Sequence, residues 1–149
     1  MAGTIEKSIE VNVPVSTAYN QWTQFEEFPQ FMDGVESVTQ QDDTHLHWVA
    51  EIVGVRREWD AEIVEQVPDQ RIAWRATGGT RNDGTVIFLP EGPDKTRITL
   101  QLDVEPEGLV EKTGDALGFV SKKAEGDLKR FAEFIENRGS ETGAWRGTV

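Results

Sequence analysis

The sequence contains no cysteine among its 149 residues. This absence excludes disulfide bonds, thiol nucleophiles and zinc or iron–sulfur sites with cysteine ligands, and it fits a reducing compartment. Long apolar runs are also missing. No stretch approaches the roughly 20 apolar residues that a membrane-spanning helix needs, and the first residues lack the apolar run of a signal peptide. We therefore expect a cytoplasmic protein with no stable insertion into a membrane.

Basic residues are scarce relative to acidic ones. Fifteen lysines and arginines stand against 27 aspartates and glutamates, which gives a formal net charge of −12. Binding to nucleic acids or anionic membranes draws much of its strength from clustered Lys and Arg, so we expect neither partner. Six arginines nevertheless gather in the middle of the chain, which leaves room for a local anion site: Arg56, Arg57, Arg71, Arg75, Arg81 and Arg97.

Known catalytic and metal-binding motifs are absent as well. The chain has no G-x-S-x-G elbow, no H-E-x-x-H, no P-loop and no dinucleotide G-x-G-x-x-G. Its two histidines, His45 and His47, would share one face of a strand with Glu51, but alternation turns that face toward solvent. A transition-metal site needs three or four convergent ligands, so we expect no metal and no other cofactor.

Alternating apolar and polar residues predict seven strands. The pattern is clear at residues 5–13, where Ile5, Ile9 and Val11 alternate with polar side chains. Turn signals then separate six further candidate strands, at residues 35–41, 45–53, 56–67, 70–77, 84–89 and 96–104. Connections this short allow only hairpins, so the sheet should be antiparallel.

Helical patterns lie before and after this run of strands. Ser16 or Thr17 could cap a short helix that follows Pro14, and Pro29 interrupts a second short helical piece. Near the C-terminus, apolar residues recur at spacings of three and four, the stripe of a long amphipathic helix: Leu117, Val120, Ala124, Leu128, Phe131 and Ile135. We expect one domain over residues 1–138 and a flexible tail over residues 139–149, which Trp145 could dock.

The segment WTQFEEFPQFM at residues 22–32 and the order of elements around it resemble the START-like (SRPBCC) superfamily, in particular its polyketide cyclase/dehydrase and coenzyme Q-binding members. The resemblance covers all but about the last dozen residues. It implies an α+β helix-grip fold of the START/Bet v 1 type, with seven antiparallel strands curved around the C-terminal helix and two short helices after the first strand. The segment holds no reactive group, so it predicts a fold rather than a reaction.

The resemblance also implies a cavity between the sheet and the long helix. Candidates for its lining are Trp48, Trp59, Trp74, Phe88 and Phe119, with Phe31 and Met32 near the mouth. The same aromatic residues could simply form the core, since each buries about 150–250 Å². Gly114 and Gly118 would let residues 107–120 bend as a lid, or they mark a loosely packed helix start.

Three functions remain open at this point. The first is binding of a hydrophobic small molecule such as a lipid, an isoprenoid quinone or an aromatic polyketide, by burial of its apolar surface. The second, which the resemblance includes, is a polyketide aromatase/cyclase-dehydratase, with Tyr19 and either Arg57 or Glu58 polarising a carbonyl. Arg57 and Glu58 point to opposite faces of their strand, so only one of them can face a cavity.

The third function is a ligand-responsive interaction module. An apolar patch around Phe25, Phe28 and Phe31 that stays uncovered in the monomer would support it. The sequence is compatible with a monomer or a homodimer.

Overall fold

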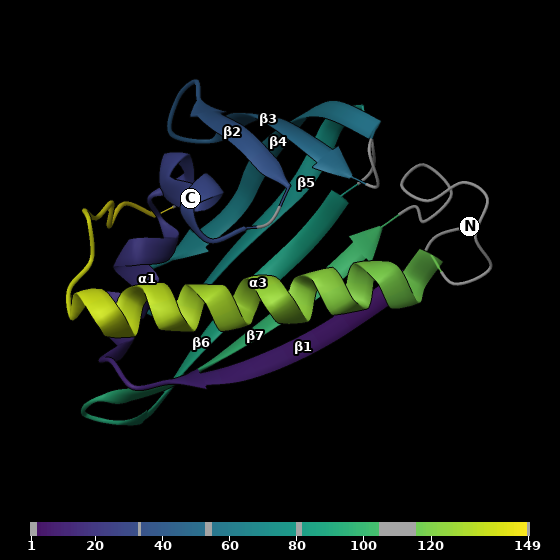
Figure 1. Ribbon diagram of the computed structural model, residues 1–149. Helices are drawn as coiled ribbons and strands as arrows, with labels where there is room; N and C mark the ends of the chain where they lie inside the picture. Colours follow the sequence, from purple (N-terminus) through teal and green to yellow (C-terminus); the bar gives the residue numbers. More distant parts are fainter. Residues whose placement is uncertain (1–2, 33, 53–54, 80–81, 105–115, 149) are drawn as a thin grey trace.

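Seven strands of one sheet and a long C-terminal helix make up most of the molecule (Figure 1). The computed structural model describes residues 3–32, 34–52, 55–79, 82–104 and 116–148. The strands are β1 (Gly3–Val11), β2 (Val35–Gln40), β3 (His45–Ile52), β4 (Val55–Val67), β5 (Arg71–Gly79), β6 (Asn82–Gly92) and β7 (Lys95–Val104). The helical elements are α1 (Val15–Trp22), the 3₁₀ helix η1 (Phe25–Gln30) and α3 (Ala116–Arg138).

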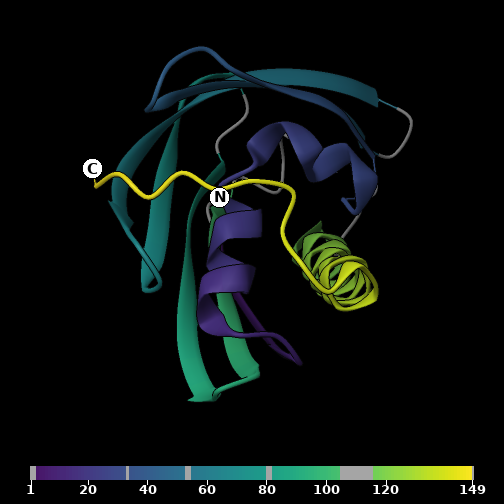
Figure 2. The same cartoon turned by 90° about the vertical axis from the view of Figure 1, so that its left-hand side faces the viewer.

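The sheet is antiparallel throughout, in the order β1-β7-β6-β5-β4-β3-β2. Each strand from β2 to β6 therefore pairs with the next one along the chain, and β1 pairs with β7. Figure 2 shows the sheet curving around α1, η1 and α3. The predicted helix-grip fold is confirmed, because the short connections force the hairpins and the apolar stripe of α3 must be covered by the concave face.

Several predicted boundaries are wrong by a few residues. Strand β1 ends at Val11, and β5 and β6 extend into the glycine-rich segment that was predicted to be a turn. Helix α1 begins directly after Pro14, whose carbonyl accepts the first helical hydrogen bond from the amide of Ala18 at 3.1 Å. Ser16 and Thr17 thus lie inside the first turn, and no side chain caps the helix.

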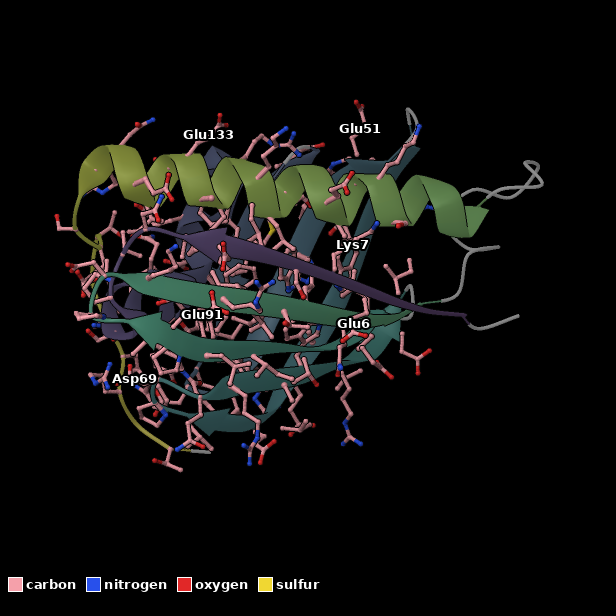
Figure 3. The ribbon with its side chains drawn as sticks, turned by 90° about the horizontal axis from the view of Figure 1, so that it is seen from below. Glu6, Lys7, Glu51, Asp69, Glu91 and Glu133 are labelled. Carbon is pink, nitrogen blue, oxygen red and sulfur yellow. The ribbon has the colours of Figure 1, made fainter. Side chains whose placement is uncertain are left out.

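The described part of the predicted apolar stripe of α3 is buried, whereas the side chains of Leu117 and Val120 lie outside the described residues. Ala124, Leu128, Phe131 and Ile135 are at most 4% exposed. One polar contact ties the same helix to the first strand, where Lys7 Nζ lies 3.8 Å from a carboxylate oxygen of Glu125 (Figure 3). None of the described helices is long and apolar enough to span a membrane.

The C-terminal segment leaves α3 at Gly139 and runs across α1 (Figure 2). Gly139 has a φ of +75°, which glycine adopts without the steric cost that a side chain would impose. That the segment frays in solution stays a prediction. Its contacts with α1 are described below.

Candidate ligand-binding site

The inner face of the sheet is buried unevenly. Near α1, Ile72 and Ile98 are both 0% exposed. Farther along the same strands, Trp74 (two residues after Ile72) and Leu102 (four residues after Ile98) point to the same side but are only partly buried. We call the region of Tyr19, Trp22, Ile72, Phe88, Ile98 and Phe131 the closed end, and the region of Trp48, Arg57, Trp59, Trp74 and Leu102 the open end.

A tryptophan pair lies on the inner face at the open end. Trp48 of β3 and Trp59 of β4 are directly opposite each other in the ladder. Their rings stack with centroids 5.6 Å apart and an interplanar angle of 10°. Trp59 is 6% exposed, whereas Trp48 is only partly buried and also contacts Phe28 of η1 at 5.6 Å. The pair presents a flat aromatic surface that a side chain or a ligand can cover.

Trp74 of β5 owes its position to a glycine on the neighbouring strand. Gly84 of β6 is its cross-strand partner, and a Cβ built there would lie 2.6 Å from Cζ2 of Trp74 and 3.0 Å from Cδ2 of Leu102. The indole therefore lies closely against the backbone of β6. The sequence pattern placed Gly84 at the boundary between a turn and the predicted strand at residues 84–89, and it did not predict this close approach.

Arg57 is the inward-facing residue beyond Trp59 on β4, opposite Ala50 of β3. Its Nε atom is buried and has no hydrogen-bond partner in the described part of the chain. A buried N–H without an acceptor costs free energy, so this guanidinium is a donor able to bind an oxygen atom beside the tryptophan pair. Glu58 points to the convex face, where it accepts a hydrogen bond from His47 Nε2 at 3.0 Å.

Tyr19 lies at the closed end and not beside Arg57. Its side chain is 0% exposed and its ring contacts Phe88 edge-on, at 5.5 Å. Among the residues that the structure describes, none makes a well-formed hydrogen bond with its hydroxyl. Burial raises the pKa of Tyr19, and the nearby Gln66 amide opposes this only in part. Tyr19, Arg57 and Glu58, the three groups predicted as catalytic candidates, are thus not brought together.

Phe31 and Met32, predicted near the mouth of a cavity, border a surface groove of about 530 Å³. Phe31 itself is 2% exposed, with ring contacts to Phe131 at 5.2 Å and to Phe134 at 5.3 Å. Arg130 lies along the groove and donates from Nε to the carbonyl oxygen of Phe31 at 2.9 Å. The groove residues are Pro29, Gln30, Phe31, Met32, Gly34, Val35, Glu36, Glu51 and Arg130.

The remaining candidates for the cavity lining and the lid are only partly described. Phe88 packs in the closed end against Trp22, with ring centroids 6.2 Å apart. The side chain of Phe119, the side chain of Arg81 and most of the predicted lid at residues 107–120, including Gly114, are not described. Gly118 lies within the first turns of α3.

Carboxylates hold both histidines on the convex face. His47 contacts Asp60 at 2.8 Å and Glu58 at 3.0 Å, and these hydrogen bonds raise its pKa. His45 contacts Asp42 at 2.9 Å. Within the residues that the structure describes, no three His, Asp or Glu side chains are arranged to hold a metal ion.

The apolar patch that would have supported an interaction module is not exposed. Phe25, Phe28 and Phe31 are 5%, 2% and 2% exposed. Their rings contact one another in series, at 5.4 and 5.5 Å, under β3 and α3. The aromatic segment at residues 22–32 is therefore part of the core, because its rings fill the space between the sheet and the long helix.

Comparison with known proteins places the chain in a family. Residues 11–133 match the model of the family described as polyketide cyclase / dehydrase and lipid transport. An uncharacterized 17.2 kDa protein of Streptomyces lincolnensis is 56% identical over 146 residues, 97% of each chain.

Two solved structures share the fold. A START superfamily protein from Mycobacterium smegmatis is 22% identical with a TM-score of 0.70, covering 91% of this chain and 95% of its own. The aromatase/cyclase Zhui from Streptomyces sp. R1128 is 14% identical with a TM-score of 0.76, covering 97% of this chain and 100% of its own. The predicted relation to polyketide cyclase/dehydrase proteins is confirmed, and the chain belongs to the polyketide cyclase / dehydrase and lipid transport family.

Proposed function

We propose that the chain binds a hydrophobic small molecule at the open end, against the tryptophan pair and Trp74, with Arg57 contacting an oxygen atom of the ligand. The family supports hydrophobic ligand binding or a polyketide cyclase role. The observation that carries the proposal is the buried Nε of Arg57, which lacks a partner within the described residues and stands one inward position from the stacked indoles.

Apolar contacts with the tryptophans would supply general affinity, and the hydrogen bond from Arg57 would supply selectivity. Apolar surface of the ligand gains about 25 cal/mol for each Å² removed from water, which favours any molecule of suitable size. A hydrogen bond from a charged donor adds about 1.5–3 kcal/mol and is directional. Arg57 would therefore select ligands that carry a carbonyl, phenol or carboxylate oxygen next to a flat apolar body, such as a quinone, a fatty acid or an aromatic polyketide.

The test is extraction of the purified protein followed by mass spectrometry, together with tryptophan fluorescence titrations against quinones, fatty acids and polycyclic phenols. The variant Arg57→Gln should weaken binding of oxygenated ligands about tenfold, in line with the strength of a charge-assisted hydrogen bond. It should leave binding of the matching hydrocarbons unchanged.

Arg75→Gln is the matched control, because Arg75 lies on the convex face and pairs with Glu62 at 3.1 Å. It should leave the affinity for every ligand unchanged. A protein that yields no extract and whose fluorescence ignores the whole panel would contradict the proposal.

A polyketide cyclase is the second candidate, and the same arginine favours it. A guanidinium that hydrogen-bonds a ketone oxygen would stabilise the enolate that forms during aldol closure. Tyr19 lies at the closed end and Glu58 on the convex face, so Arg57 alone of the three nominated groups stands beside the tryptophans. Incubation with a poly-β-ketone analogue should give cyclised product that Arg57→Gln abolishes; unchanged analogue with retained binding would favour the carrier.

A further inference from the structure

The outer side of α1 carries a polar face that is almost fully buried. Asn20, Gln21 and Thr23 are 9%, 0% and 2% exposed. Polar side chains on a short outer helix are usually left to water. Here residues 141–146 of the C-terminal segment cover them (Figure 2). We call Asn20, Gln21 and Thr23 the α1 polar face.

The α1 polar face contacts the main chain of the segment. The amide N–H of Thr142 donates to Oε1 of Gln21 at 2.8 Å, and Nε2 of Gln21 donates to the Thr142 hydroxyl at 3.1 Å. The amide N–H of Trp145 donates to the hydroxyl oxygen of Thr23 at 3.1 Å. Side chains that satisfy backbone donors of an extended strand are a means of peptide recognition.

Arg146 fixes the far end of the segment. Its guanidinium donates to Oδ1 of Asn20 at 2.6 Å and to Oδ2 of Asp69 at 2.8 Å, and it lies over the Tyr19 ring, 5.6 Å from the centroid. The other amide atom of Asn20, Nδ2, donates to Glu141 at 2.8 Å. Both amide groups of the α1 polar face are thus used at both their donor and acceptor atoms.

Asp69 is held in a conformation that presents its carboxylate. It lies in the turn between β4 and β5 with a φ of 62°, and it is the one non-glycine residue with positive φ among those described. Aspartate tolerates this left-handed region better than most residues. Figure 3 shows Asp69 beside the C-terminal segment. Its position supplies the negative charge that Arg146 meets.

The fit depends on the sequence of the segment as well. A Cβ built on Gly143 would lie 2.7 Å from Oε1 of Gln24, so the end of the Gln24 side chain would have to move aside for any other residue. Gly139 and Ser140, which join the segment to α3, are exposed. The link is therefore free to redirect the segment without breaking any core packing.

We propose that the α1 polar face and Asp69 form a docking site for an extended peptide, and that its occupant is the C-terminal segment of this chain, bound in cis in a monomer and exchangeable with that of a second copy. Every hydrogen bond described above can also form when the C-terminal segment comes from a second copy of the chain. This equivalence is the condition for domain swapping. Exchange needs only a change of direction at the exposed link of Gly139 and Ser140.

The docking site is observable without any substitution. Amide exchange in the intact protein should be at least tenfold slower at Thr142 and Trp145 than at Ala144, because the first two N–H groups are hydrogen-bonded and that of Ala144 has no partner within the described chain. Arg146→Ala should reduce the protection at both sites. Arg75→Ala, which removes an arginine from the convex face, should not.

Binding in trans is tested with a labelled peptide of residues 139–149. Fluorescence anisotropy should detect its binding to the full-length Arg146→Ala protein, whose own segment is weakened. The same peptide carrying Arg146→Ala should bind at least tenfold more weakly. The unmodified protein should also bind it at least tenfold more weakly, because its own segment competes at an effective concentration of about 1 mM. No binding to either protein, or equal exchange at Thr142, Ala144 and Trp145, would overturn the proposal.

Discussion

The closed end and the open end of the inner face share strands β5 and β7 but differ in how they are covered. At the closed end, Tyr19, Trp22 and Phe131 fill the space above the sheet and contact one another or Phe88 edge-on, at 4.9–6.2 Å. At the open end, Trp48 and Trp74 remain partly exposed, and Arg57 keeps an unpartnered buried N–H among the described residues. The closed end is therefore filled by side chains, whereas the open end keeps partly exposed aromatic surface.

The largest effect is expected at the closed end. Phe131 is 0% exposed and contacts Trp22 at 4.9 Å, so Phe131→Ala should lower the free energy of unfolding by about 3–5 kcal/mol. Trp74→Ala at the open end should cost about half as much, because the indole is only partly buried. Urea unfolding measures both. Equal losses of unfolding free energy in the two variants would show that the two ends are packed alike and would contradict the distinction between them.

Gly84→Ala should cost less but should disturb the open end specifically. The new Cβ would meet Cζ2 of Trp74 and also the carbonyl oxygen of Gln101 at 2.9 Å, which is backbone and cannot move aside easily. We expect a loss of about 1–3 kcal/mol and a shift in tryptophan emission. Gly92→Ala is the control, since nothing lies nearer than 4.0 Å to its added Cβ. If Gly84→Ala changed neither the free energy of unfolding nor the tryptophan emission, Trp74 would be free to move away from β6.

A substitution at Tyr19 should have a small effect on stability, and unlike the substitutions above it should not be destabilising. Its buried hydroxyl lacks a partner in the described residues, so Tyr19→Phe should be neutral or stabilising by up to about 1 kcal/mol. Because burial raises its pKa above the ordinary 10.0, its contribution to stability is complete below pH 10 and is lost as the pH rises through the folded pKa.

Absorbance titration can isolate this group, since Tyr19 is the only tyrosine in the chain. The variant Tyr19→Phe should lack the part of the alkaline loss of stability that belongs to this ionisation. An ordinary tyrosine titration in the folded protein would show that water reaches the closed end.

His47 should give the smallest effect, because it lies on the convex face and touches neither end. Hydrogen bonds that the ring donates to Asp60 and Glu58 raise the pKa of His47 above the ordinary 6.5. Its stabilising contribution is therefore complete below pH 6.5 and is lost as the pH rises through the folded pKa. NMR titration of the ring should show the raised pKa, and Asp60→Asn should lower it. If Asp60→Asn left the pKa of His47 unchanged, the hydrogen bond to Asp60 would not be the cause of the raised value.

Periodicity was sufficient to predict the architecture but not the details of the site. Period-two strands, short turns and the apolar stripe of α3 predicted the antiparallel sheet and its cover, because these patterns reflect local geometry. The close approach of Trp74 to Gly84 was missed, since it depends on the register of two strands. The separation of Tyr19 from Arg57 was also missed, since it depends on where α1 packs against the sheet. Both are long-range relations that no local pattern encodes.

The class of fold, the antiparallel pairing and the inward direction of Trp48 could be predicted from the amino-acid sequence, because strand alternation follows from backbone geometry. Alternation also predicted that Arg57 and Glu58 point to opposite faces, but the three-dimensional fold was needed to show that Glu58 is the outward one and which inward residues are fully buried. The fold also decided that Arg146 returns to Asn20, Asp69 and α1, across 126 residues of sequence for the first contact. Such contacts form only when distant segments are brought together by burial of the core.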